Sequence, residues 1–191
     1  MKQLFKKILT GSSIPEKYTK IFTHLTPEEK FSLLNLSKGL PKNSVLVEIG
    51  SYLGASSCFI SMGAENKNNK LYCVDTWQND AMTEGKRETF DIFKENTSDF
   101  KEIILPLRGK SDEVAAKFDK QIDFIFFDGD HSYEGIKTDW EKWSPKLKSG
   151  AVAIFHDWGW AEGVVKLINE DVKPRVTKEE NLPNMYWAWI K

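Results

Sequence analysis

The sequence predicts an α/β protein built on a doubly wound, mostly parallel β-sheet. Short apolar runs rich in β-branched residues alternate about five times with longer amphipathic segments, and this alternation is typical of β-α units. The apolar runs are nearly continuous, which indicates strands that are covered on both faces. Two further β-like runs at the C-terminus predict a terminal antiparallel hairpin.

The expected strands share a short apolar core that ends at a polar or turn-forming residue. They cover residues 44–49, 70–74, 102–107, 122–127 and 151–155, followed by hairpin runs at 173–176 and 185–190 that a polar turn at 177–184 joins. Sequential strands joined by helical segments give a right-handed arrangement with helices on both faces.

Helices are expected where apolar residues recur at helical spacing between these strands. They cover a segment that starts at Thr26, residues 55–64, 86–97, a short helix to about 118, one around 133–143, and 162–171. The first of them opens with Thr26, Pro27 and two acids, a combination that is typical of a helix N-terminus. Tyr133, Ile136, Trp140 and Trp143 fall on one helical face, which predicts packing on the core.

Overall composition excludes several classes of partner. The net charge of −1 gives no electrostatic reason to expect binding to nucleic acid or to an anionic membrane. The N-terminal residues 1–13 are basic and partly apolar, too short and too interrupted to span a membrane, and we expect an amphipathic helix there. The two cysteines, Cys58 and Cys73, are predicted to be buried thiols in a reducing, cytoplasmic environment.

The chain length of 191 residues suits one compact unit with an extension. We divide it into an N-terminal helical segment, residues 1–40, which acts as a lid or packs on the rest, and a main domain, residues 41–191. The oligomeric state is open, and the terminal hairpin offers a surface through which a homo-oligomer can form.

Acidic and imidazole side chains follow two of the expected strands. The run at 122–127 ends in Asp128-Gly129-Asp130-His131, and the run at 151–155 ends in His156-Asp157. Ligands of open α/β sheets bind outside the carboxyl ends of the strands. The sequence therefore predicts an active site at this edge, with Asp130 more simply interpreted as a helix cap.

The turn after the first strand reads Glu48-x-Gly50-x-x-x-Gly54. It lacks the three glycines of the dinucleotide fingerprint, although its two glycines permit a tight turn and a close approach of a ligand to the backbone. Glu48 disfavours a pyrophosphate and suits a ligand with an ammonium group. A purely structural turn is the alternative interpretation.

Two later loops complete the expected ligand site. Asp75 ends the second strand, where doubly wound folds bind two ribose hydroxyls through a carboxylate. Trp77 lies just beyond it and is expected to stack on a base. Ser111 and Asp112 open a helix after the third strand, where they either cap the helix or border an adenine pocket.

These motifs together carry a family resemblance. The segments VEIGSYLGASS, VDTW and FFDGDHSYEG, with the later FHD, resemble the class I S-adenosylmethionine-dependent methyltransferases. More narrowly, they are similar to the small-molecule O-methyltransferases of the catechol type and the macrocin (sugar) type. The resemblance covers about residues 41–168 and implies a seven-stranded sheet with one antiparallel strand in the last hairpin.

The resemblance implies S-adenosylmethionine as cofactor and assigns roles along the chain. The implied cofactor-binding residues are Glu48, Gly50, Ser51, Tyr52, Gly54, Asp75, Thr76, Trp77, Ser111, Asp112 and Asp128. Asp128 and Asp157 are the implied ligands of a divalent cation, Mg²⁺, with His156 as a further ligand, and His131 is the implied catalytic base. The sugar-methylating members carry an acid where this chain has His156, and Trp158 stands where the catechol type has Asn.

The chemistry of alcohol methylation suits the same residues. Hard oxygen ligands favour Mg²⁺, which lowers the pKa of a bound hydroxyl, and a histidine can accept its proton. An ordering role in the loop is the alternative for His131 and for His156, whereas Trp158 and Trp160 are candidates for the acceptor pocket wall.

The predicted function is methyl transfer from S-adenosylmethionine to a hydroxyl of a small acceptor, a sugar or sugar-bearing metabolite before a phenol, with metal assistance. The alternatives are a metal-independent methyltransferase of another small molecule and a module that binds the cofactor without catalysis. A nucleotide-sugar dehydrogenase or reductase is disfavoured because the dinucleotide glycines are missing.

Overall fold

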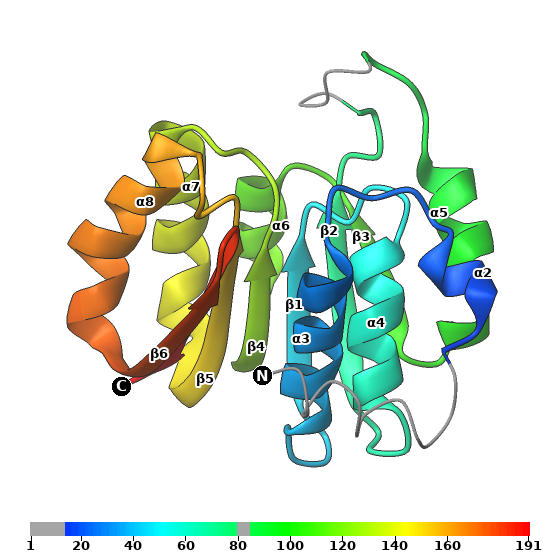
Figure 1. Cartoon of the computed structure of the whole chain (residues 1–191), viewed down its shortest axis with the longest axis horizontal. Helices are drawn as coiled ribbons and strands as arrows, with labels where there is room; N and C mark the ends of the chain where they lie inside the picture. The colour runs from blue at the N-terminus through cyan, green and yellow to red at the C-terminus, as the bar shows by residue number, and fades with distance from the viewer. Residues whose placement is uncertain (1–13, 80–84) are drawn as a thin grey trace.

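The computed structural model describes residues 14–79 and 85–191 (Figure 1). Its strands are β1 (Val45–Ile49), β2 (Lys70–Asp75), β3 (Ile104–Arg108), β4 (Ile122–Phe127), β5 (Leu147–His156), β6 (Val176–Leu182) and β7 (Met185–Ile190). They form one seven-stranded sheet in the order β3-β2-β1-β4-β5-β7-β6. The strands from β3 to β5 are parallel, and β7 runs antiparallel between β5 and β6. The predicted fold class is confirmed.

Strand register sets the position of the candidate site. Ile49, the last residue of β1, pairs with Val74 in β2 and with Phe127 in β4, and Phe127 pairs with Phe155 in β5. The carboxyl ends of four neighbouring strands therefore lie at one level, and the residues that follow them meet at one edge of the sheet.

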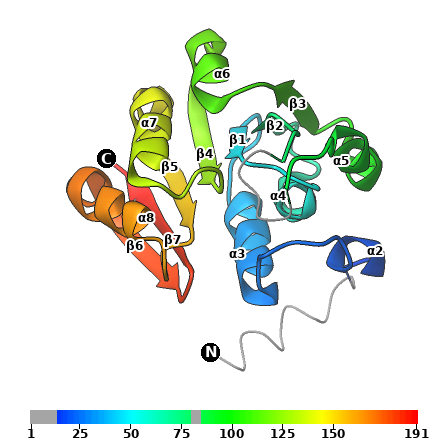
Figure 2. The same ribbon diagram turned by 90° about the horizontal axis from the view of Figure 1, so that it is seen from above.

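Helices cover both faces of the sheet (Figure 2). The α-helices are α2 (Glu16–Thr19), α3 (Pro27–Lys38), α4 (Ala55–Ala64), α5 (Phe90–Asn96), α6 (Ser111–Lys117), α7 (Tyr133–Trp143) and α8 (Glu162–Leu167). Short 3₁₀ turns cover Ser98–Phe100, Ser144–Lys146 and Lys173–Arg175, and a π-helical turn covers Ile168–Val172. In Figure 2, α2 to α5 lie on one side of the sheet and α6 to α8 on the other.

Two hydrophobic cores result, one on each face, because successive strand residues point in opposite directions. Leu46 of β1 packs with Phe59 of α4 in one core, whereas Val47 packs with Trp140 of α7 in the other. The helical face predicted from Trp140 and Trp143 is buried as expected.

The N-terminal helix α3 packs on α4. A capping box holds its start: Thr26 Oγ1 accepts a hydrogen bond from the Glu29 amide, and the Glu29 carboxylate accepts one from the Thr26 amide. Leu33 of α3 is fully buried, and Gly63 of α4 allows the close approach, since a Cβ there would lie 2.0 Å from Ser37 Oγ. The predicted helix in residues 1–13 lies outside the described residues.

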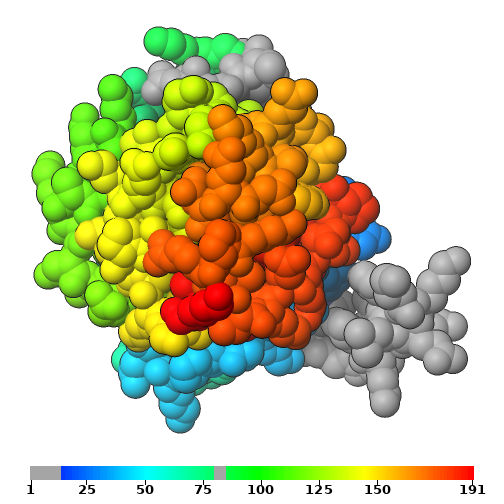
Figure 3. All heavy atoms as spheres, turned by 90° about the vertical axis from the view of Figure 1, so that its left-hand side faces the viewer, coloured from blue at the N-terminus to red at the C-terminus, as the bar shows by residue number. Residues whose placement is uncertain are grey.

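The C-terminal segment differs most from the sequence prediction. Residues 177–184 were expected to form a polar turn, but β6 covers Val176–Leu182, and residues 173–175 form a 3₁₀ turn. β6 is an edge strand whose middle residues are exposed, so it has no apolar pattern, and its charged residues protect the edge. Figure 3 shows the left-hand side of Figure 1, and the C-terminal third of the chain forms most of this face.

β5 starts four residues before the predicted strand, at Leu147. Cys58 and Cys73 are buried free thiols, as predicted, while the cytoplasmic location stays a prediction. Within residues 14–79 and 85–191, no helix combines the length and apolar character that crossing a membrane requires.

Candidate active site

A cavity of about 960 Å³ lies at the carboxyl edge of the parallel strands. The loops after β1, β2, β3, β4 and β5 all contribute to its wall, and residues 22–24 of the N-terminal segment close one side. The structure thus brings most of the predicted site residues together around one cavity. This cavity lies at the sheet edge where the sequence predicted the active site.

The turn after β1 is locked to its neighbours by backbone contacts. Gly50 has a φ of +84°, and a Cβ there would lie 2.1 Å from the Asp128 carbonyl oxygen, so only glycine fits. Asp75 Oδ2 accepts hydrogen bonds from the amides of Ser51 (2.9 Å) and Tyr52 (2.8 Å). The three turn residues and Asp75 line the cavity.

The loops after β2 and β3 also contribute to the cavity wall. Thr76, Ser111 and Asp112 line the cavity as predicted. Ser111 Oγ accepts a hydrogen bond of 2.8 Å from the Trp143 indole, which ties the start of α6 to α7. Ser111 therefore has a structural contact as well as a place on the cavity wall.

Glu48 does not line the cavity. It shares the strand face of Leu46, so its side chain points under α4, where it is fully buried and accepts a hydrogen bond from the Ser57 hydroxyl. Its Oε1 has no hydrogen-bond partner among the described residues. Burial raises the pKa of this carboxyl above its usual value. Direct contact with a ligand's ammonium group does not fit this position.

Trp77 and Gly54 also lie away from the cavity wall. The Trp77 ring is fully buried, packs with its centroid 4.8 Å from those of Phe90 and Phe93, and donates to the Tyr52 carbonyl at 3.1 Å. It is therefore part of the core and cannot stack on a base there. Gly54 caps α4 with a φ of +87° and faces Thr97.

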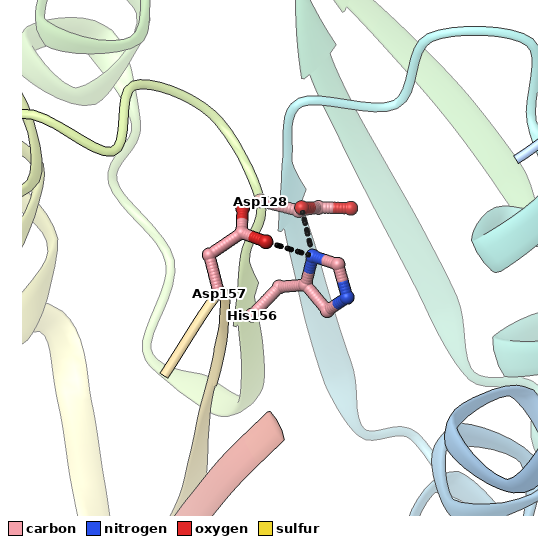
Figure 4. A group of neighbouring side chains, drawn as sticks. All are labelled: Asp128, His156 and Asp157. Atoms are coloured by element: carbon pink, nitrogen blue, oxygen red, sulfur yellow. Dashed lines mark ion pairs between the residues drawn. The ribbon is translucent and has the colours of Figure 1, made fainter. Parts of the chain in front are cut away.

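The other half of the cavity contains a cluster formed by Asp128, His156 and Asp157 (Figure 4). Nδ1 of His156 lies 3.0 Å from Asp128 Oδ1 and 3.2 Å from Asp157 Oδ1. Asp157 has a φ of +59°, an unfavourable conformation for a residue with a Cβ. The same carboxylate pairs through Oδ2 with His131 Nδ1 at 3.0 Å.

Charges in this cluster depend on one another. Burial raises the pKa of Asp128, whereas hydrogen bonds from His131 and His156 outweigh burial and hold the pKa of Asp157 well below its usual value. Burial alone would lower the pKa of His156, but the surrounding carboxylates, Asp128 first, raise it to about 12. The hydrogen bond that His131 donates to the Asp157 carboxylate raises the pKa of His131.

Comparison with known proteins gives the family. A family model described as a methyltransferase domain matches residues 47–158, which is more than half of the chain. The chain belongs to this methyltransferase family. The match includes the turn after β1, Asp75, and the cluster residues Asp128 and Asp157, so the resemblance inferred from the sequence motifs is confirmed.

Individual relatives agree with this assignment at the level of fold. The methyltransferase resembles an O-methyltransferase from Bacillus cereus solved in complex with SAH (14% identity, TM-score 0.73, 99% of this chain and 96% of that one). It also resembles CalS11, a TDP-rhamnose 3′-O-methyltransferase of calicheamicin biosynthesis (16% identity, TM-score 0.62, 98% and 91%). An uncharacterized protein of Sinorhizobium fredii, y4gI, is 30% identical over 116 residues, which span 59% of this chain and 13% of that protein.

Sequence reasoning missed several residues at the candidate site. Glu29 of α3 is only 2% exposed, and its Oε2 lies 3.6 Å from His156 Nε2. Asn184, from the β6–β7 turn, donates to Asp157 Oδ1 at 3.2 Å. Phe22 and Asp139 line the cavity. The capping motif at Thr26 predicts that Glu29 lies in the first turn of a helix. No local pattern in the sequence shows that the Glu29 side chain faces His156, at the end of a distant strand.

Asp139 supports a prediction about stability and pH. It is a buried carboxyl in α7, and burial raises its pKa from 3.8 to about 6. The folded state therefore binds more protons than the unfolded state between these values, and the stabilising contribution of the neutral form is lost as pH rises through about 6. We expect Asp139→Asn to be more stable than the wild type by about 3 kcal/mol at pH 8, and nearly equal to it at pH 4.

Urea unfolding at pH 4 and pH 8 measures both differences. Asp112→Asn is the matched control, because Asp112 lines the same cavity but is exposed. A gain for Asp139→Asn that is the same at both pH values would contradict the assignment of the shift to Asp139.

Proposed function

We propose that the protein transfers a methyl group from S-adenosylmethionine to a hydroxyl group of a small acceptor, with a sugar as the leading candidate and a phenol second. The main support is the His131–Asp157 pair. In this pair a carboxylate orients a histidine, and both residues line the same cavity as Asp75 and the turn after β1. Such a pair can accept a proton from an acceptor that lies next to a methyl donor.

The donor half is supported by the turn around Asp75. Its carboxylate sits at the end of β2, where ribose hydroxyls bind in doubly wound folds, and it retains acceptor capacity beyond its bonds to the backbone amides. Thr76, Ser111 and Asp112 line the same cavity and are the proposed neighbours of the adenine ring. The Bacillus cereus relative was solved with SAH, which supports the same cofactor here.

The acceptor half is supported by the orientation of His131. Its Nδ1 faces Asp157, so Nε2 is the nitrogen left to take the hydroxyl proton. In the proposed step the acceptor oxygen forms a bond to the methyl carbon, the bond between that carbon and sulfur breaks, and the proton moves to Nε2. Asp157 then stabilises the imidazolium. Holding both reactants in one cavity supplies the alignment that an in-line displacement needs.

A divalent cation fits the cluster of Asp128, His156 and Asp157. One donor atom from each lies within 4.8 Å of the others, and two of the three are carboxylate oxygens. A bound cation would lower the pKa of an acceptor hydroxyl, and Mg²⁺ is the ion that the family resemblance implies. These three residues would hold it, with Trp160 and Asn184 orienting Asp157 through hydrogen bonds of 2.8 Å and 3.2 Å.

A sugar acceptor is supported by the printed function of CalS11, a TDP-rhamnose 3′-O-methyltransferase. The cavity adds exposed aromatic surface, since Phe22 and Trp160 line it with 54% and 63% of their surface accessible. Aromatic faces suit the apolar face of a sugar ring as well as a phenol.

A metal-independent methyltransferase is the second candidate, and one observation favours it. His156 lies between the two carboxylates and, when protonated, offsets one of their two negative charges, while His131 pairs with Asp157 from the other side. In that case Asp128 and Asp157 shape the pocket and orient His131. A module that binds the cofactor without turnover is the remaining alternative.

Two measurements test the proposal. Calorimetric titration with S-adenosylmethionine is expected to give saturable heat, and its absence at high concentration would reject the whole proposal. A screen with isotope-labelled methyl donor over sugars, nucleotide sugars and phenols, read by mass spectrometry, is expected to label a hydroxyl. Binding without labelling of any acceptor would favour the non-catalytic module.

A chelator separates the two catalytic candidates. We expect excess EDTA to abolish turnover and an added divalent cation to restore it, because the acceptor hydroxyl is a weak acid that His131 alone deprotonates poorly. Activity with the labelled donor is the readout, and cofactor binding in EDTA is the control. Full activity in EDTA would establish the metal-independent candidate.

A further inference from the structure

The second ring nitrogen of His156 faces a carboxylate from a distant part of the chain. Nε2 lies 3.6 Å from Glu29 Oε2, and both side chains are almost fully buried, 3% and 2% exposed. Glu29 belongs to α3, in the N-terminal segment, whereas His156 ends β5 on the sheet. The contact therefore joins the N-terminal helix to the proposed cation site.

Glu29 is held in place independently of His156. Its Oε2 accepts a hydrogen bond of 2.8 Å from the Thr26 amide, and the Glu29 amide donates to Thr26 Oγ1 at 3.3 Å. The capping box thus fixes the carboxylate before any cation is considered. A buried carboxylate needs a compensating donor, and the His156 ring is the charged partner that the described contacts give it.

This arrangement determines which nitrogen of His156 can bind a cation. Without a cation, the carboxylates on both sides of the ring favour a proton on each nitrogen. A cation between Asp128 and Asp157 would displace the proton from Nδ1, while the Glu29 carboxylate favours keeping the other proton on Nε2, so that Nδ1 is the nitrogen that would bind the cation. The Asn184 amide also lies 3.3 Å from Nε2. Its hydrogen bond is neutral and its amino group also donates to Asp157, so the buried charge of Glu29 has the stronger effect.

The resulting donor set contains one nitrogen and two oxygens. Mg²⁺ is a hard cation that prefers oxygen ligands and retains water, whereas imidazole suits first-row transition ions. We propose that this site binds a divalent first-row transition ion, such as Mn²⁺ or Co²⁺, more tightly than Mg²⁺, and that Glu29 is the positioning residue for His156. The inference rests on the cation site of the proposed function.

Metal titrations of the purified, full chain test the ion preference without measuring turnover. We expect Co²⁺ and Mn²⁺ to bind at least about tenfold more tightly than Mg²⁺. The Co²⁺ visible absorption band is expected to change in His156→Asn, which replaces the ring by a neutral amide, and the preference over Mg²⁺ is expected to shrink. Equal affinities for Co²⁺, Mn²⁺ and Mg²⁺ in the wild type would overturn the proposal.

Glu29→Gln isolates the positioning role, because glutamine can keep the capping box through its amide oxygen while it removes the charge. We expect this variant to bind Co²⁺ about 10- to 100-fold more weakly. Glu28→Gln removes an equal charge from the same helical turn at an exposed position, and Thr26→Ala weakens the cap while the Glu29 carboxylate stays. Both controls are expected to bind Co²⁺ like the wild type.

The outcomes separate this inference from the proposed function. If S-adenosylmethionine binds with saturable heat but Glu29→Gln binds Co²⁺ as tightly as Glu28→Gln does, the positioning role is overturned and the methyltransferase proposal stands. No binding of any tested ion, with cofactor binding intact, overturns the cation site as well. Absence of cofactor binding instead rejects the proposed function, whatever the metal titrations show.

Discussion

Replacing His131 with glutamine is expected to lower kcat by about 10²- to 10⁴-fold, the usual contribution of a general base. Glutamine keeps a polar side chain of similar reach but cannot accept a proton, so the hydroxyl of the acceptor stays protonated as the methyl group approaches. The Asp157 carboxylate, which holds His131 Nδ1 at 3.0 Å, would lose its partner without losing its contacts to Trp160 and Asn184.

The measurement is single-turnover methyl transfer with the acceptor found in the labelling screen. Cofactor affinity from calorimetry is the control, and we expect it to be unchanged, because His131 lies in the acceptor half of the cavity. Normal turnover by His131→Gln would remove His131 as the base and leave only its role in ordering the loop.

Asp75→Ala is expected to weaken the binding of S-adenosylmethionine by about 100-fold or more, since hydrogen bonds to a charged acceptor contribute about 1.5–3 kcal/mol each. The substitution removes the proposed acceptor for the ribose hydroxyls. It also leaves the amides of Ser51, Tyr52 and Trp77 without their acceptor, so the turn after β1 is expected to loosen.

Calorimetry measures this effect, and thermal unfolding reports the loss of the turn. Asp75→Asn separates the two, because the amide keeps one oxygen for the backbone and lacks the negative charge. Asp112→Asn, at an exposed position that lines the same cavity, is expected to change affinity by less than about tenfold, as for one exposed contact. Wild-type affinity in Asp75→Ala would place the ribose elsewhere.

Much of the fold was predictable because its strands are short apolar runs that end abruptly. β4 shows this most clearly: six residues of nearly continuous apolar sequence stop at Asp128, and the structure ends the strand there. β6 was not predictable in the same way. An edge strand with exposed residues carries no apolar signal, and only pairing with the apolar β7 makes it a strand.

The site was predictable to the extent that it follows strand ends. Asp75, Asp128, His131 and Asp157 lie at the cavity because each is at the end of a strand or in the loop that follows it, at the same edge of the sheet. Glu48 lies one residue short of the end of β1, so strand alternation turns it towards α4. The contact between Glu29 and His156 depends on how α3 packs, which local sequence does not encode.

The contact between Gly50 and the Asp128 carbonyl has a consequence for how the two halves of the cavity relate. It leaves no room for a side chain between the loops after β1 and β4, so the spacing between the donor and acceptor compartments is set by main chain against main chain. Side chains such as Phe22 and Trp160 can then be exchanged to suit another acceptor while that spacing stays constant. Substrate choice can therefore change through the side chains of the cavity, while the main chain preserves the geometry of the reaction.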